Sequence, residues 1–294
     1  LHGCTQPRFF DPVKNLTYDF CSRSHANEAC AGGVINFVLR WWRILFSRGR
    51  QRQSIAPGPR PKPVPKSHVE QVFRGRTTGD TDFTLSVLTK FHRKYSSLCH
   101  QFTSKWAKRG TPRVLRILEV KVPGNTYRKY VGYKKAKRNV RRRFHGTSSS
   151  PQCNFFVDLK GKPCSSKECN VCNICTNGFV LQGNVGGTVK TTGYRLRYGE
   201  GLYFSSVSGK SNDYAQQSEK VGSDGKKVRC MFIANVTAGN AYLTQQASLG
   251  KDKCPPAGYD SVVGEAGGGL NHDELVVYKN EAAIPSYLIV YALP

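Results

Sequence analysis

The chain has 294 residues and a formal net charge of +26, enough sequence for one large domain or two small ones. The charge is uneven, because residues 1–144 hold 31 Lys and Arg against 7 Asp and Glu, whereas residues 145–294 hold 14 against 12. The basic half either contacts nucleic acid or another polyanion, or is a solvated and partly disordered region without a specific ligand. The second half is near neutral, as in an ordinary globular domain.

The eleven cysteines are not distributed as in a small secreted disulfide scaffold. Five of them fall in the window 153–175, which contains two successive C-x2-C steps. Such close spacing suits tetrahedral thiolate coordination better than pairing across a core, and an odd count excludes complete intramolecular pairing. We therefore expect an intracellular protein, nuclear or cytoplasmic, with a structural zinc. Disulfides or free buried thiols are the alternatives.

No run of apolar residues reaches the length of a membrane span. The nearest stretch, 31–46, contains Arg40 and Arg43, which favours an interfacial or buried helix. No secretory signal is visible at Leu1, and the lack of an initiator Met there indicates a fragment or a processed product. Residues 31–84 form a basic, Pro-rich linker or insertion, extended and polyproline-like over 54–66.

The first regular element that the sequence predicts is a helix. Apolar and aromatic residues recur at three- and four-residue steps from Leu85 to Trp106. The apolar run 114–122 then predicts a strand, closed by a Pro-Gly pair. A basic run at 134–143 leads directly into His145. It is either a nuclear-import or phosphate-binding patch or a solvated edge beside a catalytic strand.

Beyond His145 the sequence alternates short apolar runs with turns rich in Gly, Asn and Pro. One further helix is predicted, around 210–218. Short strands with few helices indicate an α+β domain built from packed, mainly antiparallel sheets. The predicted strands are 201–205, 229–236, 260–264, 274–278 and 286–292.

Three short segments carry the residue types of a catalytic site. His145 begins the string His-Gly-Thr, glycines flank a strand that contains Tyr203, and Glu274 heads an apolar strand. Glycine lets the backbone approach a ligand closely, and a carboxylate at such a strand is costly to bury without a partner. Each segment alone also has a structural explanation, as a histidine at a strand end, a strand with core aromatics or a satisfied acid.

In this order the three segments resemble the H-Y-E triad of the poly(ADP-ribose) polymerase (PARP) type of ADP-ribosyltransferase. Residues 199–214 match the pattern G-x-G-[IL]-Y-F…S-K-S-x-x-Y, with Gly209 in place of the usual serine, and residues 271–288 match the C-terminal pattern of the family. The cysteine cluster and the string GYDSV at 258–262 resemble the fungal and plant branch. The resemblance implies the PARP-type fold, with a catalytic domain over 85–294 and its core at 145–294.

The resemblance also implies NAD as the donor substrate and a role for each matched residue. His145 would hydrogen-bond the adenosine ribose, while the Gly146 backbone and the Ser211 hydroxyl would hold the nicotinamide carboxamide. Tyr203 and Tyr214 would stack on the nicotinamide ring, since an aromatic face attracts a cationic pyridinium. The implied triad is His145, Tyr203 and Glu274, and the implied NAD-binding set is His145, Gly146, Thr147, Tyr203, Ser211 and Tyr214.

Glu274 would bind a hydroxyl of the nicotinamide ribose and perform the central chemistry. A carboxylate beside a ribose that gains positive charge stabilises the transition state more than the ground state, and it can deprotonate the acceptor. The expected acceptor is a protein, with single or repeated transfer left open. The alternatives are a non-catalytic zinc- or nucleic-acid-binding protein and an NAD-dependent modifier of nucleic-acid ends, with the basic N-terminal half holding the nucleic acid.

The layout of the family further implies four zinc ligands and a spare cysteine, Cys175. The metal would be a closed structural staple near the NAD pocket, not a catalytic ion. Residues 1–30 resemble a small zinc finger found ahead of this enzyme branch; Cys4, Cys21 and His25 remain of it, so the site is truncated or is completed by His2. The four implied ligands of the main site are Cys153, Cys164, Cys169 and Cys172.

Overall fold

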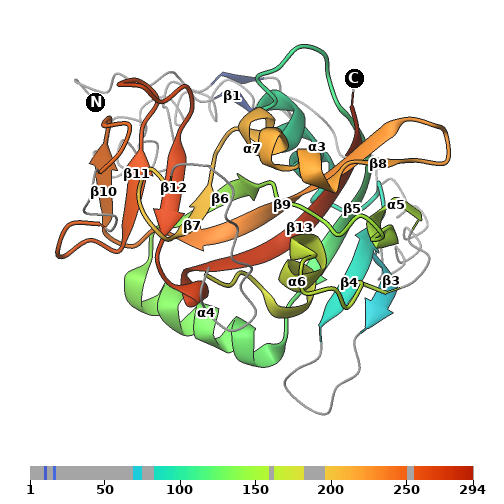
Figure 1. Ribbon diagram of the computed structural model, residues 1–294, viewed down its shortest axis with the longest axis horizontal. Coiled ribbons are helices and arrows are strands. Elements are labelled where there is room, and N and C mark those ends of the chain that lie inside the picture. Colours follow the sequence, from blue (N-terminus) through green and yellow to red (C-terminus); the bar gives the residue numbers. More distant parts are fainter. Residues whose placement is uncertain are drawn as a thin grey trace, which may run out of the picture. The chain divides into compact units, whose positions relative to one another are not determined.

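The computed structural model describes residues 83–158, 162–181, 196–249 and 255–293, with the backbone of the strand segments 10–11, 16–17 and 69–74 (Figure 1). The chain divides into two compact units, Leu1–Pro63 and Val64–Pro294. In the first unit, β1 (Phe10–Asp11) pairs antiparallel with β2 (Leu16–Thr17). The predictions for the N-terminal zinc ligands and for the stretches 31–46 and 54–66 lie outside the described residues.

The larger sheet of the second unit has seven strands, all in antiparallel pairs. Their order is β3-β4-β5-β13-β9-β6, with β8 pairing β9 beside this path. The long central strands β9 and β13 are almost entirely buried, as expected for runs rich in branched and aromatic side chains with both faces covered. The strands are β3 (Val69–Arg74), β4 (Thr84–Leu88), β5 (Arg113–Lys121), β6 (Val140–His145), β8 (Lys220–Val221), β9 (Lys227–Thr237) and β13 (Ala283–Ala292).

The smaller sheet has four strands in the order β10-β11-β12-β7. The pair β10–β11 is parallel and the other two pairs are antiparallel. The two sheets join where Phe144 of β6 exchanges backbone hydrogen bonds of 2.8 and 3.1 Å with Ser205, just past β7. This joint brings the edge strands of both sheets together. The strands are β7 (Leu202–Phe204), β10 (Ala241–Thr244), β11 (Ser261–Gly264) and β12 (Glu274–Val277).

Helices are few in the described part of the chain, so the fold is the predicted α+β class with two mainly antiparallel sheets. No described helix has the length and apolarity that crossing a membrane requires. The helices are α3 (Tyr95–Ser104), α4 (Gly124–Lys137), α5 (Phe155–Asp158), α6 (Asn170–Asn177) and α7 (Ser208–Tyr214), with the 3-10 turns η1 (Gln216–Ser218) and η2 (Asn280–Ala282).

An aromatic cluster packs α3 onto the large sheet. The ring of Phe102 lies 4.9 Å from that of Tyr291 and 6.3 Å from that of Phe144, centroid to centroid. All three side chains are fully buried, and each such burial contributes about 2–3 kcal/mol. Phe144 therefore fixes β6 against the core immediately before His145.

The prediction that a helix begins at Leu85 is wrong for its first ten residues. Residues 84–88 form β4, in which Leu85 pairs with Val120 of β5, and α3 begins only at Tyr95. Phe91, which was predicted to lie on the apolar helix face, is 84% exposed. Three-residue steps between apolar residues fit a buried strand followed by a turn as well as they fit a helix, and here pairing with two neighbouring strands decides the outcome.

Helix α4 and strand β13 are among the other elements that differ from the prediction. Helix α4 was not predicted, because only Tyr130 of its fourteen residues is buried and no apolar stripe marks it. Strand β13 starts at Ala283 rather than at Ser286, because a register shift between Pro285 and Tyr287 accommodates the proline, which has no N–H to donate.

Candidate functional site

The three predicted triad residues lie at the joint between the two sheets. His145 ends β6, Tyr203 is the middle residue of β7, and Glu274 begins β12. In the β7–β12 pair Tyr203 stands opposite Val276. Since directly opposed residues share a face and side chains alternate along a strand, Tyr203 and Glu274 lie on the same face of the small sheet.

The imidazole of His145 is held in one orientation. Its Nδ1 lies 2.8 Å from the carbonyl oxygen of Tyr203. A carbonyl can only accept, so Nδ1 carries a hydrogen in this contact and Nε2 is the nitrogen at which a ligand would bind. Phe179 and Phe204 pack on the ring at centroid distances of 5.2 and 5.4 Å. The bond to Tyr203 therefore joins the first two triad residues directly.

Gly146 follows His145 and lies against the backbone of α7. A Cβ atom at this position would overlap the carbonyl oxygen of Ser211, so no side chain fits. Ser211 is itself buried, 4% exposed. The structure thus brings together the two residues predicted to hold the nicotinamide carboxamide, with Thr147 half-buried beside them.

The two predicted stacking tyrosines differ in their surroundings. The Tyr203 hydroxyl accepts the backbone N–H of Tyr198 at 3.0 Å and donates to the carbonyl of Gly199 at 2.8 Å. Burial, and secondarily the Glu274 carboxylate, raise the pKa of Tyr203 well above its usual value, so this ring is neutral and fixed. Tyr214, at the end of α7, is 43% exposed.

Glu274 is a buried carboxylate with two unlike oxygens. The residue is 6% exposed, and its Oε1 lies 2.7 Å from Nζ of Lys210 on α7. Lys210 also donates to the backbone carbonyl of Asp273 at 3.1 Å. Within the described part of the chain, Oε2 has no hydrogen-bond partner. A buried acceptor left unpaired costs about 1–3 kcal/mol, which a ligand that donates to Oε2 would recover.

A pocket of about 240 Å³ opens beside this carboxylate. Sequence reasoning missed two of the residues that line it, Arg197 and His272, because they lie in loops without any periodic pattern. Lys210 falls within the matched S-K-S string but received no role. The polar and aromatic residues that line the pocket are Arg197, Lys210, Asp213, Tyr214, Asn271, His272 and Glu274.

Asp273 positions the beginning of β12. Sequence reasoning gave this residue no role. Its Oδ1 accepts hydrogen bonds from the hydroxyls of Ser205 and Ser206 at 3.0 and 2.8 Å and from the Ser206 N–H at 2.9 Å. Its Oδ2 lies 3.7 Å from Nε of Arg143 in β6. These contacts tie the neighbour of Glu274 to both β7 and β6, and so fix where the catalytic candidate stands.

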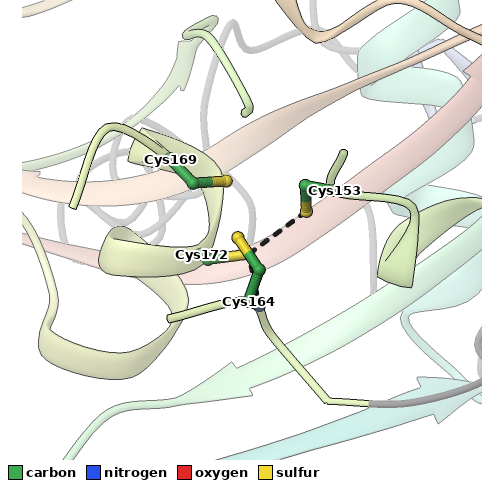
Figure 2. Close-up of side chains that lie close together, drawn as sticks. All are labelled: Cys153, Cys164, Cys169 and Cys172. Carbon is green, nitrogen blue, oxygen red and sulfur yellow. Dashed lines mark hydrogen bonds between the residues drawn. The ribbon is translucent and has the colours of Figure 1, made fainter. Parts of the chain in front are cut away.

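The four predicted zinc ligands come together in one group. Figure 2 shows their sulfur atoms pointing toward a common centre, and all four lie within 4.8 Å of one another. The Sγ atoms of Cys153 and Cys172 are 3.4 Å apart. Four thiolates around a zinc ion at about 2.3 Å would stand about 3.8 Å apart, so this spacing fits a tetrahedral metal. Cys175 is fully buried outside the group.

The thiols of this group interact strongly. Hydrogen bonds from Cys153 and then Cys172 lower the pKa of Cys169 well below its usual value. The backbone N–H of Cys164 also donates to Cys172 Sγ at 3.2 Å. Hydrogen bonds within the group, together with burial, raise the pKa of Cys153 and Cys172, so Cys169 is the thiol that most readily supplies the thiolate form that binds metal.

Comparison with known families gives one match. Residues 164–293 match the model described as the poly(ADP-ribose) polymerase catalytic domain. The observed α+β fold, with few helices and two mainly antiparallel sheets in the described residues, is consistent with a PARP-type catalytic domain. The match covers less than half of the chain and contains Tyr203 and Glu274, whereas His145 lies upstream of it. It supports NAD-dependent ADP-ribosyl transfer as the activity of this PARP-type region, with NAD as the substrate.

Proposed function

We propose that this protein transfers ADP-ribose from NAD to a protein acceptor and releases nicotinamide. The observation that carries the proposal is Glu274, a buried carboxylate that shares a sheet face with Tyr203. One of its oxygens is paired with Lys210, and the other lacks a partner within the described residues. A merely structural acid would satisfy both oxygens, so the arrangement favours a ligand.

The residues present fit NAD. Gly146 packs against the backbone of Ser211, which keeps the two residues proposed to hold the carboxamide next to each other, and Oε2 of Glu274 can accept a hydrogen bond from a ligand hydroxyl. Bound NAD supplies the ADP-ribosyl group and the nicotinamide that leaves. His145, oriented through Nδ1, would bind the adenosine ribose, and Tyr203 with Tyr214 would contact the nicotinamide ring.

Glu274 would do two things at this site. Lys210 holds Oε1 and thereby fixes the orientation of the carboxylate, while Oε2 is the atom placed to take the proton of the acceptor. The pocket beside it, with Arg197 and His272 in its wall, would receive the acceptor group. Burial strengthens these electrostatic contacts, because little water competes for the carboxylate.

We also infer that the four-cysteine group holds a structural zinc and that the protein works inside the cell, nuclear or cytoplasmic. The four sulfurs would fill a tetrahedral coordination sphere, leaving no open position for chemistry. A reducing compartment supports this arrangement, because oxidation would pair the close thiols of Cys153 and Cys172 instead.

The decisive experiment follows labelled NAD with the full chain. Glu274→Gln should lower label transfer about a hundred-fold or more, because it removes the base and the negative charge. NAD affinity, measured by calorimetry, should change by less than about threefold, since most contacts remain. Glu265→Gln, an exposed residue in the loop after β11, is the matched control and should transfer label like the native chain.

Label is followed on protein, on added DNA and as free ADP-ribose. Label on the protein as a single band or as a ladder would distinguish one transfer from chain elongation. Label on DNA would replace the protein acceptor with a nucleic-acid end. Equal transfer by Glu274→Gln and the native chain would contradict the role of Glu274, and no NAD turnover by the native chain would contradict the function itself.

A further inference from the structure

The region just before the site in the sequence carries many more basic than acidic residues. Residues 83–145, which include α3, α4 and β6, hold 18 Lys and Arg and a single acid, Glu119. Some of these cations are neutralised by acids from elsewhere in the chain, such as Lys108 by Asp213 at 2.8 Å and Lys137 by Asp260 at 2.7 Å. Others, which have no such partner among the described residues, gather where α4 passes into β6.

We call this group the arginine ridge. Lys134 and Lys135 lie in the last turn of α4, Arg138 follows it, and Arg141 and Arg142 belong to β6. All but Arg141 are exposed, and Arg141 is half-buried. Within the described part of the chain none of the five forms an ion pair, whereas Lys137 and Arg143 at its margins face Asp260 and Asp273.

Two ridge arginines are held in place by neutral groups. Arg141 Nε donates to the side-chain oxygen of Asn139 at 3.3 Å, and Arg142 Nη1 donates to that of Gln101 on α3 at 3.3 Å. Asn139 is itself fixed, because its amide donates to the carbonyl of Gly239 at 2.8 Å. An amide orients a guanidinium without cancelling its charge, so both cations are positioned and remain unneutralised.

The backbone at this turn takes an uncommon conformation. Arg138 and Asn139 have φ of 59° and 53°, in the left-handed region that costs a non-glycine residue free energy. The turn carries the chain from α4 directly into β6 (Figure 1), so the basic residues that end the helix are close in sequence to those of the strand. A solvated face needs neither the turn nor the oriented arginines.

The ridge leads toward the transfer site. Strand β6 ends the order of the large sheet, and Arg141 stands four residues before His145, or about 13 Å at about 3.3 Å per residue. Adjacent strand residues point to opposite faces, so Arg141 and Arg142 flank the edge strand. We propose that the arginine ridge binds the phosphate backbone of a nucleic acid at this sheet edge, because oriented guanidinium groups on both sides of the edge strand can each bind a phosphate.

The test measures binding of the full chain to a fluorescein-labelled DNA duplex by anisotropy over a salt series. Combining Arg141→Gln with Arg142→Gln should weaken binding about tenfold or more and reduce the slope of log K against log salt by about two. The control combines Arg113→Gln with Lys226→Gln, which removes equal charge from exposed residues away from the ridge, and should weaken binding less than about threefold.

Four results would overturn the proposal. Equal loss of DNA affinity in the control would indicate diffuse electrostatic attraction, and unchanged affinity in the ridge variant would show that the two arginines do not contact DNA. A raised KM for NAD with DNA affinity retained would assign the arginines to the dinucleotide, and aggregation with DNA affinity retained would show that they prevent edge-to-edge association of the sheet. The proposed DNA binding does not depend on the proposed ADP-ribosyl transfer. Glu274→Gln should bind DNA like the native chain. DNA binding by a native chain that does not turn over NAD would contradict the proposed enzyme activity and leave the proposed DNA binding supported.

Discussion

At the scale of single residues, the site depends on backbone contacts that leave no room for a side chain. Gly146 lies against the carbonyl of Ser211, and Gly209 lies against that of Trp106. Gly209 is the position where the matched pattern usually has serine. The structure explains this departure, because the backbone just after α3 packs directly on the backbone of α7 and a Cβ would overlap it. Both contacts fix α7, which supplies Lys210 to Glu274.

Replacing Gly146 by alanine tests this packing. We expect Gly146→Ala to destabilise the fold by about 2 kcal/mol and to abolish NAD binding, because α7 must move away from β6. Gly132→Ala in α4 is the matched control, since no atom lies within 4 Å of the methyl group that it would add. That change should stabilise the protein by up to about 1 kcal/mol. Urea unfolding and an NAD-dependent melting shift measure both effects, and unchanged NAD binding by Gly146→Ala would contradict the assignment.

At the scale of elements, Asp260 ties helix α4 to the small sheet. Its Oδ1 pairs with Lys137 at 2.7 Å, and its Oδ2 accepts the backbone N–H of Asn240 at 3.0 Å. The loop leaves no space for a side chain at Gly239, whose φ is 59° and whose Cβ would lie 2.5 Å from Asp260 Oδ2. Burial raises the pKa of Asp260, but the hydrogen bonds from Lys137 and Asn240 lower it by more. The pKa is therefore below its usual value.

This lowered pKa predicts a dependence of stability on pH. The carboxylate contributes its stability above the pKa of the unfolded chain, about 4, and loses it as the pH falls through the lower folded value. Asp260→Asn should therefore reduce the free energy of unfolding by about 1 kcal/mol at pH 7 and flatten its decline in acid. Asp224→Asn, an exposed partner of Arg113, is the control. Parallel pH profiles for Asp260→Asn and the native chain would count against the prediction.

At the scale of the whole catalytic unit, distant segments of the chain build one site. His145 comes from the edge of the large sheet, Tyr203 and Glu274 come from the small sheet, and α7 joins them through Ser211 and Lys210. The cysteine group closes the segment between β6 and α6, and Phe179 just past α6 packs on the His145 ring. A metal that orders this segment would thereby support His145, the residue proposed to bind the adenosine ribose of NAD.

Metal removal tests that link. We expect about one zinc per native chain by elemental analysis, and Cys169→Ser should lose it together with several kcal/mol of stability, because three ligands bind weakly. NAD affinity should fall in the same variant. Cys99→Ser, a half-buried thiol on α3 outside the group, should retain zinc and NAD affinity. Full stability of the native chain after chelation would show that the thiols need no metal.

Much of the fold was predictable where local sequence and burial agree. The strands at 229–236, 260–264 and 274–278 were placed within a few residues, because their apolar runs are bounded by clear turn residues. Helix α4 was missed because its one buried side chain gives no period, and β4 was mistaken for helix because its pairing with β5 involves residues more than thirty positions away. The roles predicted for the individual site residues stay predictions.

The sequence by itself determined the strand-rich class, the cysteine group and the set of residue types at the joint, because spacing and composition are written in order along the chain. Only the tertiary structure decided which oxygen of Glu274 is paired, that Arg197 and His272 share its pocket, and that Asn139 and Gln101 orient the ridge arginines. The reason is physical: a hydrogen bond, an ion pair or a pocket wall depends on the separation of side chains in space. Residues remote in the sequence set that separation when the two sheets join at Phe144 and Ser205.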